Sequence, residues 1–161
     1  MLIWFAVVSA VAVAEIFGSP LVDYRMVALG SVLPVIDLIV GQPTPVHTLA
    51  GPVVVLTAVM LATVGRRLLR RRLLGLPIGM FLHLVLDASW DSAQLFWWPA
   101  FGSDLSTQSV PESNAIAIRV ILELVGIGTG VWAYRWYGLT DPENRDRLIR
   151  SGHLNRSFMP S

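Results

Sequence analysis

Cysteine is absent from the 161-residue sequence, and charged residues make up only 14% of it. The lack of cysteine excludes disulfides and thiolate metal sites, so any metal would need histidine and carboxylate ligands. Lysine is also absent: all twelve basic residues are arginine, and the net charge of +1 does not suggest a nucleic-acid partner. With 54% hydrophobic residues and a mean hydropathy of +0.62, the chain lies outside the usual soluble range. This composition predicts an all-α integral membrane protein.

Five apolar segments follow one another along the chain, at about 2–17, 26–40, 49–64, 73–86 and 115–137. Open strands cannot satisfy their backbone in lipid, so these segments predict about five transmembrane helices. The second and fourth are only roughly 22 Å long as helices, short of a hydrocarbon core of ~30 Å. No basic residue precedes the first segment, which is therefore expected to be a retained helix rather than a signal peptide.

The arginines predict the topology, because five of them lie between Arg66 and Arg72. The positive-inside rule places this loop in the cytoplasm. Threading outward from it puts the N-terminus outside and the C-terminus in the cytoplasm, as expected of a multi-pass protein of the plasma membrane. The sequence thus predicts one helical membrane domain over 1–138 and a polar cytoplasmic tail over 139–161.

His83 and Asp87 are two ionisable residues in an otherwise apolar run. Their i, i+4 spacing places both on one helix face about 6 Å apart, close enough to share a metal ion or a proton. The expected topology brings Asp37 and His47 to the same outer level. Two histidines with one or two carboxylates suit a divalent cation such as Zn²⁺ and can leave a position for water.

The fifth segment adds another i, i+4 pair from the same side, Arg119 and Glu123. Arg119 is expected to neutralise a phosphate, and Glu123 to support the site or act as a base. The small-residue run from Gly126 to Gly130 permits close helix contact, either within one chain or between chains of an oligomer.

Simpler interpretations stay open for each residue. His47 alone would suit a hydrogen-bonded packing role, Asp37 a helix end, and Arg119 with Glu123 an ordinary ion pair within a helix. The aromatic residues between Trp90 and Phe101 suit either an interfacial belt or the wall of a lipid cleft. Proton or ion conduction is less well supported, because no polar residues continue the cluster through the third and fourth segments.

Several blocks of sequence resemble the membrane-bound metal-dependent hydrolases, the YdjM-like inner-membrane family. The blocks occur in the family's order: Asp23-Tyr-Arg25, Leu29-Gly-Ser-Val-Leu-Pro34-Val-Ile-Asp37, His47-Thr-Leu49, His83-Leu-Val-Leu-Asp87 with Trp90, and Leu95-Phe-Trp-Trp-Pro99-Ala-Phe-Gly102. The resemblance implies a helical membrane fold with a divalent metal held by four residues, Asp37, His47, His83 and Asp87. One position departs from the pattern: Val35 stands where the family has Asp, which predicts one metal rather than two.

The leading hypothesis is a metal-dependent hydrolase that cleaves a phosphoester or related bond in a membrane lipid or envelope substrate. Its alternative is a non-catalytic membrane protein that binds lipid or packs in a larger assembly, with the polar cluster acting as a hydrogen-bonded brace. Loss of bound metal on substitution of His83 would separate the two hypotheses.

Overall fold

The chain folds into helices in the computed structural model, which describes residues 1–19, 21–37, 41, 44–100, 116–155 and 157. No strand occurs in these ranges. The main helices are α1 (Leu2–Phe17), α2 (Tyr24–Val32), α4 (Ala50–Ala62), α5 (Arg67–Leu73), α6 (Gly75–Leu86), α8 (Ile116–Trp136) and α9 (Pro142–Ser151). Single turns complete the described part: η1 (Leu33–Val35), η2 (Pro45–His47), η3 (Ser89–Asp91) and the short helix α7 (Ala93–Phe96).

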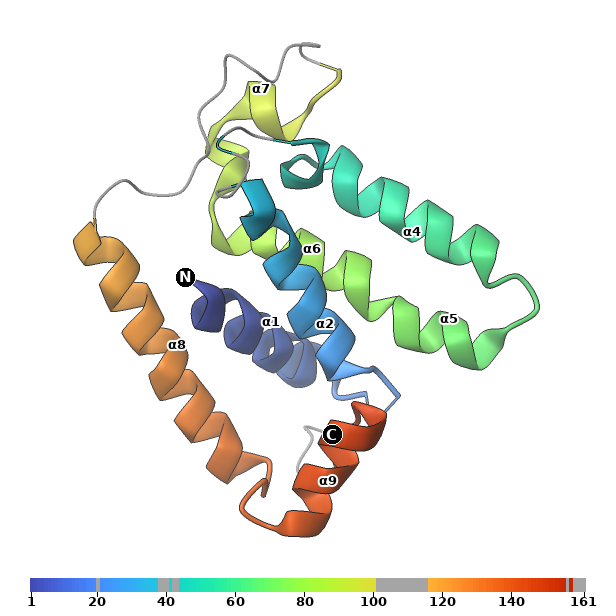
Figure 1. The fold of residues 1–161 in the computed structure, drawn as a ribbon, viewed down its shortest axis with the longest axis vertical. Coiled ribbons are helices and arrows are strands. Elements are labelled where there is room, and N and C mark those ends of the chain that lie inside the picture. The colour runs from blue at the N-terminus through green and yellow to red at the C-terminus, as the bar shows by residue number, and fades with distance from the viewer. Residues whose placement is uncertain (20, 38–40, 42–43, 101–115, 156, 158–161) are drawn as a thin grey trace.

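The crossing of α2 and α6 is the closest contact between helices in the centre of the fold (Figure 1). A Cβ atom at Gly30 would collide with the Leu76 carbonyl of α6, and one at Gly79 would collide with the Val27 carbonyl of α2. Because neither glycine has a side chain, the two backbones can touch. This approach sets the end of α2 beside the end of α6, where the polar cluster lies.

Helix α1 lies between α2 and α8, and α4 packs on α6 (Figure 1). Gly126 of α8 lies against the backbone of Trp4, where a Cβ would come within 2.7 Å of the Trp4 nitrogen. A Cβ at Gly130 would lie 3.6 Å from Cγ1 of Val7, in ordinary contact. The small residues of this run therefore serve a contact within the chain.

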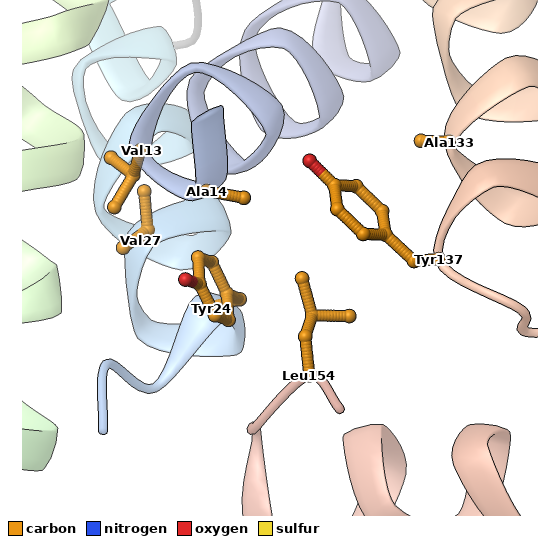
Figure 2. Close-up of a cluster of buried hydrophobic side chains, with 7 residues drawn as sticks. All are labelled: Val13, Ala14, Tyr24, Val27, Ala133, Tyr137 and Leu154. Carbon is orange, nitrogen blue, oxygen red and sulfur yellow. The ribbon is translucent and has the colours of Figure 1, made fainter. Parts of the chain in front are cut away.

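The polar C-terminal segment forms α9 and contributes to the core (Figure 2). Asp141 caps the helix by accepting a hydrogen bond from the Glu143 amide, and Gly152 ends it with a φ of 76°. Leu154 then packs into a buried cluster from α1, α2 and α8, with Val13, Ala14, Tyr24, Val27, Ala133 and Tyr137. The segment also touches α2, since the Tyr24 amide donates to the Gly152 carbonyl at 2.8 Å.

The prediction of about five transmembrane helices is wrong. Among the described residues one helix, α8 with 21 residues, is long and apolar enough to cross a membrane. Helices α1, α4 and α6 have 16, 13 and 12 residues. At 1.5 Å per residue they are roughly 18–24 Å long, short of a hydrocarbon core of ~30 Å. The predicted topology, with an outer N-terminus and a cytoplasmic C-terminus, and the multi-pass plasma-membrane location are not supported either.

Backbone conformation marks the ends of the short helices. Left-handed residues follow three of them: Gly18 after α1 with φ 50°, Gly65 after α4 with φ 77°, and Ala88 after α6 with φ 54°. Helix α2 tightens into the 3₁₀ turn η1 at Leu33, next to Pro34. Proline has no amide hydrogen to donate, which favours such a break. Apolar composition alone therefore overestimated the length of α2 most.

Candidate metal centre

Four polar side chains come together where short helices end. Asp37 follows η1, His47 ends η2, His83 lies in the last turn of α6, and Asp87 caps that helix. Asp37, His47 and His83 are at most 1% exposed, and the Asp87 side chain is 3% exposed. The structure thus brings together the four residues that the sequence singles out as metal ligands, and it buries all of them.

His47 lies between two carboxylates. Its Nε2 is 3.0 Å from Oδ2 of Asp87, within hydrogen-bonding distance. Its Nδ1 is 3.4 Å from Oδ2 of Asp37, close enough for charge attraction, although this nitrogen makes no well-formed hydrogen bond. The imidazole therefore links the segment after η1 to the end of α6.

Thr44 holds the Asp37 carboxylate in place. The Thr44 amide donates to Oδ2 of Asp37 at 3.0 Å, and the Thr44 hydroxyl donates to Oδ1 at 2.6 Å. The same hydroxyl caps η2 by accepting from the Val46 amide. A Thr-Pro pair at the start of η2 thus positions both the turn that carries His47 and the carboxylate beside it.

His83 makes one hydrogen bond and leaves one nitrogen free. Its Nδ1–H donates to the Ser31 carbonyl of α2 at 2.6 Å, because a carbonyl can only accept. The other nitrogen, Nε2, is then the unprotonated one, and it is buried with no hydrogen-bond partner in the part of the chain that the structure describes. The Phe5 ring covers the imidazole, with ring centroids 3.9 Å apart. The result is a fixed imidazole with one lone pair available.

The charges of the cluster differ between its members. Burial would lower the pKa of His47, but the carboxylates of Asp37 and Asp87 outweigh burial and raise it to about 9. Burial and the positive charge of His47 lower the pKa of His83 to about 4, against the opposing bond to Ser31. Burial would raise the pKa of Asp37, but His47 and Thr44 hold it below its usual value. At neutral pH the cluster therefore holds a His47 cation, a neutral His83 and an Asp37 anion.

Three of the residues can offer ligand atoms to a single ion. One atom each from His47, His83 and Asp87 lies within 4.8 Å of the others. Ligand atoms at ~2.0–2.2 Å from a tetrahedral ion are ~3.4 Å apart, so the most widely separated side chains would have to approach by up to about 1.4 Å. The unpartnered Nε2 of His83 and the donor set of two imidazoles and a carboxylate fit such an ion.

Asp37 is placed differently from the other three residues. It contacts the Nδ1 side of the His47 ring, while Asp87 contacts the Nε2 side. A carboxylate on the far nitrogen of a histidine ligand is a common support that fixes the ring. The structure therefore favours Asp37 as a residue that orients His47, where the sequence predicts it as a direct ligand.

Arg119 and Glu123 lie on α8, and Glu123 is engaged at the start of α1. Its two carboxylate oxygens accept hydrogen bonds from the amides of Ile3 and Trp4, each at 3.2 Å. These amides belong to the first turn of α1, so the carboxylate satisfies donors that the helix itself leaves unpaired. The catalytic roles predicted for Arg119 and Glu123 stay predictions.

Four contributors to the cluster are not singled out by the sequence pattern: Ser31, Thr44, Phe5, and Ser89, whose hydroxyl donates to Asp87 Oδ2 at 3.2 Å. Ser31 contributes a backbone carbonyl, which no side-chain pattern can reveal. The Thr44-Pro45 pair, in contrast, is a recognisable start signal for a helical turn. Phe5 gives no signal, because it is one of many apolar residues in α1.

Comparison of the chain with protein-family models, with curated proteins and with solved structures gives no match.

Proposed function

We propose that this chain is a metal-dependent hydrolase in which His47, His83 and Asp87 hold one divalent ion such as Zn²⁺. The observation that carries the proposal is Nε2 of His83, which is buried beside the other two side chains and has no hydrogen-bond partner among the described residues. Leaving a buried acceptor unsatisfied costs free energy, and a cation would satisfy it. The reaction class, cleavage of a phosphoester or related bond, is supported by the resemblance of the sequence blocks to the YdjM-like hydrolases.

Each residue then has a defined task. His83 presents Nε2 because its Nδ1–H is held by the Ser31 carbonyl. His47 presents Nε2 once that nitrogen gives up its proton, and Asp37 steadies the ring from the Nδ1 side. Asp87 supplies the negative charge. When bound, the ion would supply Lewis-acid activation of water and of the ester.

Because the ligand side chains are buried, metal binding is tested before hydrolysis. The ligand side chains are at most 3% exposed, so a substrate reaches them only when neighbouring residues move away. Metal binding does not need a bulky substrate to enter. It is therefore the direct test of the site, and hydrolysis is the second.

A non-catalytic brace is the competing function, and the position of His47 favours it. A protonated His47 between Asp37 and Asp87 already pairs charges without any ion, as its raised pKa of about 9 indicates. In that case the cluster ties η2 to the end of α6 and to the segment after η1. Such a protein would bind no metal.

The experiment measures zinc in the purified full chain after equilibration with ZnCl₂ and desalting. We expect about one equivalent in the wild type and none in His83→Ala, since three ligands become two. His153→Ala is the matched control, because His153 lies outside the cluster, and it should keep its zinc. Thermal unfolding of each variant shows whether the fold is retained.

Each outcome separates the hypotheses. Zinc retained by a folded His83→Ala variant would refute the site. A wild type without zinc, with a His83→Ala variant that is only less stable, would support the brace. Hydrolysis of bis(p-nitrophenyl) phosphate by the zinc-loaded wild type, but not by His83→Ala, would support the enzyme. Zinc binding without hydrolysis of such probes would leave a metal centre and refute this reaction class.

A further inference from the structure

A large apolar cavity runs along α6 on the side occupied by α1 and α4. It has a volume of about 480 Å³, and all the side chains that line it are apolar. Phe17 lines it from α1, Leu56 from α4, and Ile78 and Phe81 from α6. This volume is in the range of ~300–1,000 Å³ typical of small-molecule sites. Within the described ranges its walls offer no polar side chain to orient a polar ligand, so they suit a hydrocarbon chain.

Two smaller cavities extend this apolar space toward a basic surface. A cavity of about 220 Å³ is lined by Ile78, which it shares with the apolar cavity, and by Leu21 and Arg71. Leu21 and Arg71 also line a third cavity of about 330 Å³, together with Arg72 and His153. The shared residues make the three cavities adjacent, with hydrocarbon walls at one end and guanidinium groups at the other.

The charges of Arg71 and Arg72 are not neutralised within the described ranges. Other arginines have partners there: Arg25 pairs with Asp23, and Arg147 and Arg150 pair with carboxylates on α9. Arg71 and Arg72 form no such ion pair, and both are exposed. The planar guanidinium group matches the oxygen pairs of a phosphate, so these two residues suit an anionic headgroup.

We propose that the three cavities bind one anionic membrane phospholipid. One acyl chain lies between α1, α4 and α6, and the phosphate contacts Arg71 and Arg72. The guanidinium groups at one end favour a negatively charged headgroup, and the apolar walls at the other end favour a hydrocarbon chain. A phospholipid carries both. Neither a free phosphate nor a neutral hydrocarbon would use the whole site.

This lipid site is distinct from the candidate metal centre. Arg71 and Arg72 precede α6, whereas His83 lies in its last turn, about 12 Å along the helix axis from Gly75 at 1.5 Å per residue. The bound headgroup therefore lies at the opposite end of α6 from the metal ligands. Lipid binding does not depend on whether the cluster holds an ion.

The test is calorimetric titration of the full chain, in the presence of a chelator, with monomeric myristoyl lysophosphatidylglycerol. The matched ligands are myristoyl lysophosphatidylcholine, which has the same chain and no net charge, and glycerol phosphate, which has no chain. We expect the anionic lysolipid to bind at least about tenfold more tightly than either, as loss of a charge-assisted contact or of the buried chain implies.

Variants separate the two ends of the site. Arg71→Gln with Arg72→Gln should reduce the affinity for the anionic lysolipid to that for the zwitterionic one. The control, Arg147→Gln with Arg150→Gln, removes the same charge from α9 and should bind like the wild type. Leu56→Trp, at a 40% exposed position in the apolar wall, should weaken both lysolipids.

Three results would overturn the proposal: equal affinity for the two lysolipids, equal losses in the two double variants, or glycerol phosphate binding as tightly as the anionic lysolipid. The last would indicate a simple phosphate site. His83→Ala should bind the lysolipid like the wild type, so failure of the metal centre and failure of the lipid site give different results.

Discussion

A methyl group added at Gly79 tests whether the crossing of α2 and α6 builds the polar cluster. The new Cβ would collide with the Val27 carbonyl oxygen, and it would lie 2.7 Å from the Ser31 nitrogen and 2.9 Å from the Val27 carbonyl carbon. These are backbone atoms of α2, which cannot rotate away as a side chain can. The two helices must therefore separate, and the Ser31 carbonyl that holds His83 must move with α2.

The expected cost follows from two opposing effects. Forcing an extra carbon into a packed contact costs about 1–3 kcal/mol, and we take the upper half of this range, about 2–3 kcal/mol, because the carbon meets rigid backbone. Replacing glycine by alanine within a helix stabilises it by about 1 kcal/mol, which offsets part of that cost. Gly79→Ala should therefore lower the free energy of unfolding by about 1–2 kcal/mol, or Tm by roughly 2–8 °C for a chain of this size.

Gly128→Ala is the matched control, because a Cβ there meets nothing within 4 Å. It should keep the helix-propensity gain and raise the free energy of unfolding by up to about 1 kcal/mol. Thermal unfolding followed by circular dichroism compares both variants with the wild type. Zinc retention should fall in Gly79→Ala alone. A Gly79→Ala protein that unfolds at or above the wild-type temperature would refute the account of this crossing.

Two further predictions concern His47 and Glu123. In chelator-treated protein the raised pKa of His47 should contribute up to about 3 kcal/mol of stability. This contribution to the free energy of unfolding is complete below pH 6.5, the ordinary pKa of histidine, and is lost as the pH rises through about 9. Urea titrations at several pH values measure it. The same titrations of His47→Gln should show no such dependence on pH. Glu123→Gln should lower the free energy of unfolding by about 1 kcal/mol, because two amides of α1 lose a charged acceptor. Its zinc content and hydrolysis should be unchanged; a loss of hydrolysis at unchanged stability would instead support the base role predicted from the sequence.

The positions of five helices could be predicted from the sequence, but their lengths only in part. The first apolar segment, 2–17, coincides with α1, and each of the other four overlaps a helix of the structure. The segment 26–40 shows why lengths were overestimated, since α2 ends at Val32 and the chain tightens into η1 while still apolar. Hydropathy reports which residues avoid water. It does not report left-handed turns or 3₁₀ turns, and these decide whether a segment is long enough to span a bilayer.

The sequence predicts which four side chains form the cluster, because ionisable residues are rare in the apolar segments. Asp37, His47, His83 and Asp87 are each conspicuous against apolar neighbours, and the structure places them together. Their separate tasks could not be predicted, because those depend on which ring nitrogen faces which oxygen. The carbonyl of Ser31 decides the state of His83, and a carbonyl belongs to every residue alike.

The charge of the cluster fits one divalent ion better than no ion. Without metal, a protonated His47 and two carboxylates sum to a buried charge of about −1 among these side chains. With one divalent ion and two neutral imidazoles, the sum becomes about zero, and a buried cluster without net charge is less costly. This charge balance fits the proposed single ion held by two imidazoles and Asp87, with Asp37 steadying His47 from the opposite side of its ring.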